Sequence, residues 1–231
     1  MSIILAIETS AELASAALVR GQELIWRESL GVQTHSQTIL PLVQELLAAA
    51  GITVRQCDAI AFGSGPGSFT GVRTACGIVQ GLAFGADVPV IPVVTLEAMA
   101  EACRAECGAT NVLSVLDARM GEVYWSQYRY DGAWHVVSGP SLTKAEAIEP
   151  VGQVVACGNG LAAYASAFAG RDFAERGLIN VVPHAREVAQ LALAALAAGR
   201  TIAARDAQPL YLRNKVALTT IERAEKAEAA V

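Results

Sequence analysis

Charged residues are scarce in this sequence, at 17% of 231 residues, where soluble domains usually carry about a quarter. The net charge is −5, and no run of lysine or arginine occurs. This composition argues against a protein that binds nucleic acid on its own, because such binding relies on cations that neutralise phosphates. Hydrophobic residues make up 53% of the chain. Either some of these hydrophobic residues lie on the surface and contact a partner, or the abundant alanine inflates the hydrophobic count.

Long hydrophobic runs are also missing. No stretch approaches the roughly 20 apolar residues that span a bilayer, so we expect no membrane segment. The chain passes from Met1 and Ser2 straight into an apolar run at residues 3–7, without the basic region that starts a secretory signal. We therefore expect a cytoplasmic protein.

Residues that bind metals or act as nucleophiles lack the necessary spacing. The five cysteines form no paired framework, and the pair Cys103 and Cys107 has no second pair of ligands. The three histidines (His35, His135 and His184) are far apart, and none has a second histidine four residues on. We expect free thiols, no metal and no catalytic residue.

A glycine-rich stretch organises the chain. The apolar residues 59–62 predict a strand, and the glycines and proline of residues 63–67 predict a tight turn that ends it. Ser68 is suited to cap a helix over residues 69–84, with Gly85 as its C-cap. No Gly-Lys-Ser/Thr follows, which excludes a Walker A loop. The Ser68 region also lacks the Gly-x-Ser-x-Gly pattern of a nucleophile elbow, so a peptidase is poorly supported.

This predicted helix contains costly features. Interior glycines each cost about 1 kcal/mol relative to alanine, and a cation in the first turn opposes the helix dipole. A ridge of small residues on one side would let another helix approach closely, and Arg73 would suit an anion or an acidic partner. A buried helix with a solvated arginine explains the same residues. The ridge consists of Gly71, Thr74, Ile78 and Gly81, with Gly77 beside it.

The order of the predicted elements suggests a duplicated α/β fold. Three strands, a helix with Pro41 inside it, a strand and the glycine-notched helix form one βββαβα unit, and the pattern restarts at residues 112–117. We predict an N-terminal lobe at 1–107, a C-terminal lobe at 108–231 and a docked tail near 208–214. The further predictions are strands at 3–7, 14–19, 23–29, 58–63, 88–94, 112–117, 122–130, 134–137 and 154–157, and helices at 36–50 (with Thr34 and Gln37 as a capping box), 95–107 (capped by Thr95), 143–148, 161–168 and 185–198.

Several motifs together resemble the TsaB family, also called YeaZ. They cover almost the whole chain in the family's order, although Glu8 stands where the family often has aspartate. The motifs are residues 4–10 (ILAIETS), His35-Ser36 before Leu40-Pro41, residues 65–73 (GPGSFTGVR), residues 117–124 (DARMGEVY) and residues 209–213 (PLYLR).

The resemblance implies the two-lobed fold of actin, hexokinase and Hsp70. It also implies a non-catalytic role beside TsaD, which transfers threonylcarbamoyl from threonylcarbamoyl-AMP to adenosine 37 of tRNA. TsaE would join this complex, tRNA would be met only through it, and the chain alone would form a homodimer.

Two sets of site residues follow. Two helices side by side could pack against an equivalent pair on a partner, and ATP or ADP could bind where the turn lies near that interface. A kinase of the same fold, using Glu8 and Asp117, is the alternative. Whether Asp117, Arg119 and Glu122 act in function or only stabilise a turn stays open. The partner set is His35, Ser36, Ile39, Leu40, Val43, Leu47, Arg73, Thr74, Gly77, Ile78 and Gly81; the anion set is Gly65, Gly67, Ser68, Thr70 and Arg73.

Overall fold

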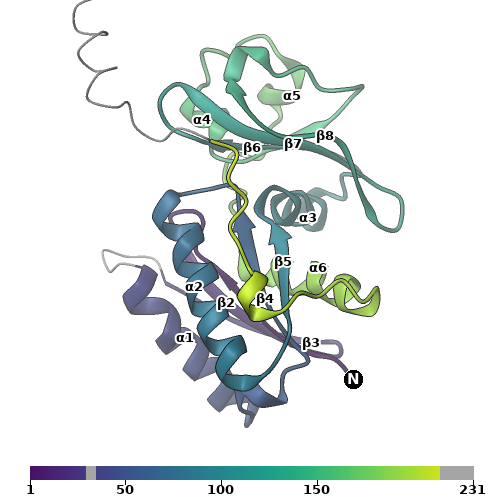
Figure 1. Ribbon diagram of the computed structural model, residues 1–231. Coiled ribbons are helices and arrows are strands. Elements are labelled where there is room, and N and C mark those ends of the chain that lie inside the picture. The colour runs from purple at the N-terminus through teal and green to yellow at the C-terminus, as the bar shows by residue number, and fades with distance from the viewer. Residues whose placement is uncertain (30–34, 214–231) are drawn as a thin grey trace, which may run out of the picture.

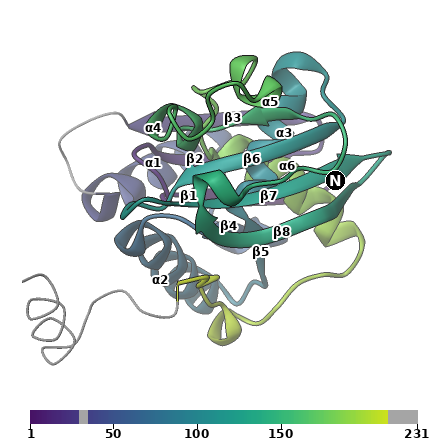
Figure 2. The ribbon, with the colours of Figure 1, turned by 90° about the horizontal axis from the view of Figure 1, so that it is seen from above.

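The computed structural model describes residues 1–29 and 35–213, and it contains two β-sheets stacked one above the other (Figures 1 and 2). The first sheet has the order β3-β2-β1-β4-β5, and the second has the order β8-β7-β6-β9. Among the described residues, no helix is long and apolar enough to cross a membrane.

The first sheet is built from strands that are buried on both faces at its centre. β1 pairs antiparallel with β2 and parallel with β4, and the continuous apolar run of β1 fits a strand covered on both sides. Helices α1 and α2 cover one face, and α6 covers the other. The bounds are β1 (Ile3–Glu8), β2 (Ala14–Arg20), β3 (Glu23–Ser29), α1 (His35–Ala50), η1 (Val54–Gln56), β4 (Ala59–Gly65), α2 (Phe69–Ala86), β5 (Val90–Val94) and α6 (Ala185–Ala197).

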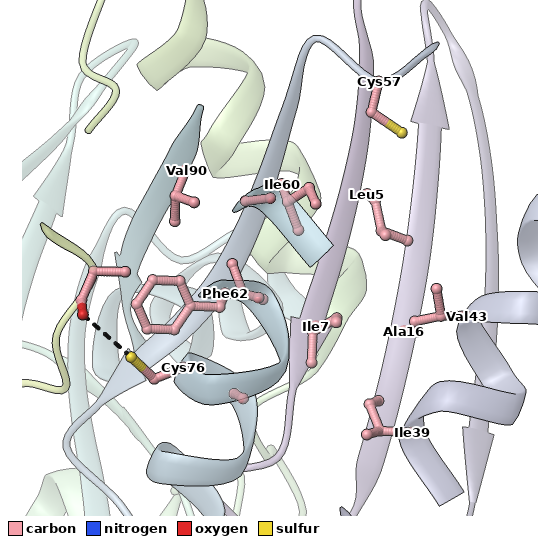
Figure 3. Close-up of a cluster of buried hydrophobic side chains, with 14 of the residues drawn as sticks. Leu5, Ile7, Ala16, Ile39, Val43, Cys57, Ile60, Phe62, Cys76 and Val90 are labelled. Atoms are coloured by element: carbon pink, nitrogen blue, oxygen red, sulfur yellow. Dashed lines mark hydrogen bonds between the residues drawn. The ribbon is translucent and has the colours of Figure 1, made fainter. Parts of the chain in front are cut away.

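The core between the first sheet and α1 and α2 is shown in Figure 3. Phe62 and Ile60 of β4 lie there beside Val90 of β5, and all three side chains are buried. The thiol of Cys76 on α2 donates a hydrogen bond to the carbonyl of Ala207 at 3.5 Å, which ties the C-terminal segment to this helix. Helix α2 is therefore held over the sheet by its buried core contacts and by this hydrogen bond to the C-terminal segment.

The second sheet lies above the first, and α3 lies between them (Figure 1). The central strand β6 pairs antiparallel with β7 and parallel with β9, as β1 does with β2 and β4. A 3-10 turn, η2, stands where the first half has the long helix α1. The bounds are α3 (Thr95–Cys107), β6 (Asn111–Asp117), β7 (Glu122–Tyr130), β8 (Trp134–Lys144), η2 (Ala145–Ala147), β9 (Val155–Cys157), α4 (Gly160–Ala163), α5 (Asp172–Glu175) and η3 (Ala204–Asp206).

The C-terminal segment returns to the first sheet and then crosses to the second. Ile202 forms a bridge with Val90 on the edge strand β5, and α6 packs on the first sheet. The amide of Leu210 then donates to the carbonyl of Ser64 at 2.7 Å. The predicted docking of the tail is confirmed up to Arg213. The domain boundary between residues 107 and 108 stays a prediction, and helix α6 of the second half belongs physically to the first sheet.

Most predicted strands and the long helices are confirmed, with four corrections. The strand predicted at 58–63 does not end at Gly63, because β4 continues to Gly65 through a register shift. Helix α2 passes Gly85 and ends at Ala86, and Asp87, with a φ of 59°, is its left-handed C-cap. Thr95 is not a cap, since Val94 holds that position and the Thr95 hydroxyl instead accepts the amide of Gly65.

The fourth correction concerns the second half. Predicted helices at 143–148 and 161–168 are reduced to η2 and to the single turn α4, while β8 extends to Lys144. Residues from both regions, among them Ile148, Leu161 and Phe168, are instead buried in one cluster with Trp125 of β7. The capping role of Thr34 lies outside the described residues.

Candidate functional site: a helical surface and a cleft

Helices α1 and α2 lie side by side on one face of the first sheet (Figure 1). Each follows the helical pattern of an apolar inner stripe, which packs on β1, β2 and β4. Ile39 and Val43 of α1 are 0% and 2% exposed. These two predicted partner residues are core residues, and the outer surface is made by others.

The outer surface of the helix pair carries almost no charge. Glu45 is the one charged residue of α1, and Arg73 is the one charged residue of α2. Surface helices normally place charged residues opposite their apolar stripe. Here the exposed side presents Leu40 (41% exposed) and Phe84 (83% exposed). Exposed apolar surface of this kind is typical of interaction sites.

Three glycines give this surface room for a close neighbour. Gly77, Gly81 and Gly85 follow one another at intervals of four residues, so they lie on one side of α2. Apart from the backbone of its own helix, a Cβ added at any of the three would meet no atom within 4 Å. We call the exposed face formed by Leu40, Gly77, Gly81, Phe84 and Gly85 the helical surface. The backbone of α2 is open to contact there.

The predicted partner residues divide by exposure. Ser36, Leu40, Arg73, Gly77 and Gly81 are exposed, whereas Leu47, Thr74 and Ile78 are half-buried. Half-buried His35 has its Nε2 atom 3.3 Å from the carbonyl of Glu12. Sequence reasoning missed Phe84 and Gly85, although Gly85 continues the four-residue spacing of Gly77 and Gly81.

A cleft of about 520 Å³ lies between the two halves. Its walls come from the loop after β1, the N-terminus of α2, the end of β6 and the tail. Apolar groups such as Val72, Leu116 and Leu212 line much of it. Its polar lining comes mainly from Ser10, Glu12, His35, Ser68, Asp117, Arg119, Asn159 and Arg213.

The five predicted anion-binding residues do not converge on this cleft. Gly67 and Ser68 line it, but the amide of Gly65 is used by Thr95 and Thr70 does not line it. Ser68 caps α2 as predicted, accepting the amide of Gly71 at 3.4 Å. The Arg73 guanidinium lies 3.2 Å from the centre of the Phe69 ring, and its Nε donates to the Tyr211 hydroxyl at 2.8 Å. Arg73 therefore holds the tail against α2.

The acidic and basic groups after β6 pair with one another. Arg119 and Asp117 form an ion pair at 3.2 Å, and the Tyr164 hydroxyl donates to Asp117 at 2.9 Å. Glu122 pairs with Arg213 of the tail at 2.8 Å. Asp117 and Arg119 therefore pair within the turn after β6, and Glu122 joins that turn to the tail. Among the described residues, no group of three or more histidine, cysteine or acidic side chains could hold a metal.

Glu8 is fully buried at the end of β1. One carboxylate oxygen accepts the amide of Ser10, and the other has no hydrogen-bond partner among the described residues. A Cβ at Gly63 would lie 1.7 Å from that second oxygen, so the glycine makes room for the carboxyl group. Burial raises the pKa of Glu8 above its ordinary value.

We expect Glu8→Gln to change how stability depends on pH. A raised folded-state pKa stabilises the fold below the ordinary value of 4.5, and this contribution is lost as pH rises toward the folded-state pKa. Within that window the wild type should lose up to about 1.4 kcal/mol per pH unit relative to the variant. Urea unfolding of both proteins from pH 4.5 upward measures the difference. Parallel curves would contradict a buried, protonated Glu8.

Comparison with known proteins connects these features to one family. A family model described as TsaD, tRNA N6-adenosine threonylcarbamoyltransferase, matches residues 29–220. The tRNA threonylcarbamoyladenosine biosynthesis protein TsaB of Escherichia coli K12 is 40% identical over 93% of this chain and 96% of its own length. The same protein of Haemophilus influenzae is 40% identical over 92% and 94%.

A solved structure points to the same family as these relatives. YeaZ from Pseudomonas aeruginosa superposes with a TM-score of 0.85 at 36% identity, covering 92% of this chain and 100% of that one. The motifs at residues 65–73 and 117–124, which carry the resemblance in the sequence, form the N-terminus of α2 and the turn after β6 at the cleft. The chain belongs to the TsaB (YeaZ) family.

Proposed function

We propose that this protein is a non-catalytic partner in the formation of N6-threonylcarbamoyladenosine at position 37 of tRNA. Its helical surface would bind a TsaD-type protein, which transfers threonylcarbamoyl from threonylcarbamoyl-AMP. The observation that carries the proposal is the exposed, nearly uncharged face of α1 and α2, with Phe84 83% exposed and three open glycines. The names of the relatives place them in the same biosynthesis.

A helix pair of this shape suits an equivalent helix pair. Small residues at a helix interface let two backbones approach closely, and apolar residues beside them supply the buried area. If the partner has the same fold, its two corresponding helices would complete a four-helix bundle. The same surface would then form a homodimer when the chain is alone, so the homodimer and the mixed complex would exclude each other.

Three further parts belong to the proposal. The two sheets, with the same pairing around β1 and β6, support duplicated halves of the actin, hexokinase and Hsp70 kind. TsaE would join the complex, and ATP or ADP would bind at its interface rather than in this chain alone. The protein would work in the cytoplasm and meet tRNA only through its partner.

The kinase alternative finds less support in the site. Such an enzyme needs an acid from each half facing the cleft, and Asp117 lines it. Glu8 is 0% exposed and its neighbours enclose it. A peptidase is not favoured either, because the Ser68 hydroxyl accepts the amide of Gly71 as a helix cap.

Reconstitution tests the proposal. The purified chain, TsaD, TsaE, threonylcarbamoyl-AMP and tRNA would be mixed, and the modified adenosine would be measured by mass spectrometry after nuclease digestion. We expect product only when this chain and TsaD are both present. Product from this chain without TsaD would show that this chain is itself an enzyme. Full activity of TsaD and TsaE without this chain would rule out the partner role.

A further inference from the structure

A second groove, on the side of α3 and α6, has an acidic lining that the proposed function does not use. Its volume is about 560 Å³, a size typical of small-molecule sites. Four glutamates and one arginine line it. We call this cavity the acidic groove; its charged or polar lining is Glu12, Glu28, Glu106, Asn180, His184, Arg186 and Glu187.

Glu187 in this groove has an oxygen without a partner. The residue is 6% exposed, and its Oε2 atom makes no hydrogen bond with any described residue. Its Oε1 atom lies 3.6 Å from the Arg186 Nε, beyond hydrogen-bond distance. A buried carboxylate oxygen in this state is costly unless a donor reaches it. The wall of the groove therefore contains a buried acceptor, which a cationic donor that reaches it would satisfy.

His184 cannot supply that donor. Its Nδ1 atom accepts the backbone amide of Arg186 at 3.0 Å, and so caps the N-terminus of α6. The ring proton must then sit on Nε2, which donates to Glu28 at 3.0 Å. Nδ1 faces Glu187 Oε2 at 3.9 Å with a lone pair rather than a proton. The imidazole thus satisfies Glu28 and leaves Glu187 unsatisfied.

The chemistry of the groove selects the kind of cation. No group of three or more metal-ligating side chains lies together in the described part of the chain, which disfavours a metal ion. A guanidinium gains most from a two-pronged contact with both oxygens of a carboxylate, and here Arg186 already lies beside Oε1. A primary ammonium is compact and can donate to the single free oxygen. The glutamates at the rim, Glu12 and Glu106, are exposed and would attract further ammonium groups.

We propose that the acidic groove binds a linear aliphatic polyamine, with one terminal ammonium on Glu187 Oε2 and the others along the rim glutamates. Such a ligand supplies several ammonium groups on a thin apolar chain, which matches one deep acceptor and several exposed ones. Ala102 and Ala105 of α3 would contact the methylene groups. The site is separate from the helical surface, because α6, which lines the groove, covers the face of the first sheet opposite α1 and α2.

Calorimetric titration of the full chain with spermidine at low salt tests this site. We expect saturable binding that weakens at least tenfold in Glu187→Gln. A second variant, Ala105→Arg, leaves Glu187 intact and places a cation on the exposed groove wall; it should weaken binding similarly. Asp172→Asn, at an exposed acid outside the groove, serves as the matched control and should bind as the wild type does. Thermal unfolding of each variant confirms that it is folded.

Two further measurements test whether the ammonium contacts Glu187 and whether the groove prefers a polyamine to a monoamine. Burial raises the pKa of Glu187, so ammonium binding should release protons, seen as a dependence of the heat on buffer ionisation that is lost in Glu187→Gln. n-Butylamine, with one ammonium, should bind at least tenfold more weakly than spermidine. Equal affinity for both amines would overturn the polyamine assignment, and unchanged spermidine binding by Glu187→Gln or Ala105→Arg would overturn the site.

Discussion

Replacement of Gly77 by leucine is expected to abolish association with a TsaD-type partner while the fold is kept. The added side chain would stand in open space in the free protein, because a Cβ at this position would meet no atom within 4 Å apart from the backbone of its own helix. In a complex, the same space would be filled by the partner helix. We expect the dissociation constant to rise by a factor of about 100 or more, close to 3 kcal/mol. Pull-down and calorimetry with purified TsaD measure this change.

The matched control is Ala194→Leu on α6. It adds a similar apolar side chain to an exposed position of a helix, but on the opposite face of the first sheet. Partner binding should be unchanged in this variant, whereas Gly81→Leu should repeat the effect of Gly77→Leu. The homodimer should dissociate in the same variants, as measured by sedimentation. Normal binding by both glycine variants would show that the partner does not use the helical surface.

Ile78→Asp, a substitution at another residue of the predicted partner set, is a poorer test. The Ile78 side chain is half-buried and packs against the core beneath α2. A carboxylate there would lose this packing and would be partly desolvated, so the fold itself would suffer. Loss of binding by that variant could come from unfolding alone.

Much of the first half could be predicted from local sequence. The apolar run of β1, the neighbouring strands β2 and β3, and the capping hydroxyl of Ser68 each depend on residues close in sequence, and the structure has them where the sequence predicts them. The second half was harder, because α4 and η2 are too short to show a helical period. Tertiary contacts, with Phe168 and Ile148 in one cluster, decide that region.

In the candidate sites too, features set by local sequence could be predicted and features set by long-range contacts could not. The spacing of Gly77 and Gly81 indicated an exposed ridge, and this depends only on helix geometry. The use of Arg73 could not be foreseen, because its partner Tyr211 lies 138 residues further along the chain. The acidic groove brings together Glu12, Glu106 and Glu187, and no sequence pattern connects these three.

The glycines of α2 are of two kinds, and alanine substitutions should separate them with opposite signs. A Cβ at Gly71 would lie 1.9 Å from the carbonyl oxygen of Thr9 and 3.2 Å from the Ser10 Cα, and these backbone atoms cannot rotate away. The Thr9 hydroxyl donates to the carbonyl of Gly71 at 2.7 Å, so α2 is held directly against the end of β1. Gly71 therefore serves packing within the chain rather than a partner helix.

We expect Gly71→Ala to lower the free energy of unfolding by about 3 kcal/mol or more, since overpacking against fixed backbone lies at the upper end of such costs. Gly77→Ala, the same change in the same helix, should instead raise it by up to about 1 kcal/mol, because alanine favours the helix and meets nothing. Urea unfolding of the two variants measures both changes. If they shifted stability in the same direction, the distinction between the packed and the open side of α2, on which the helical surface depends, would be wrong.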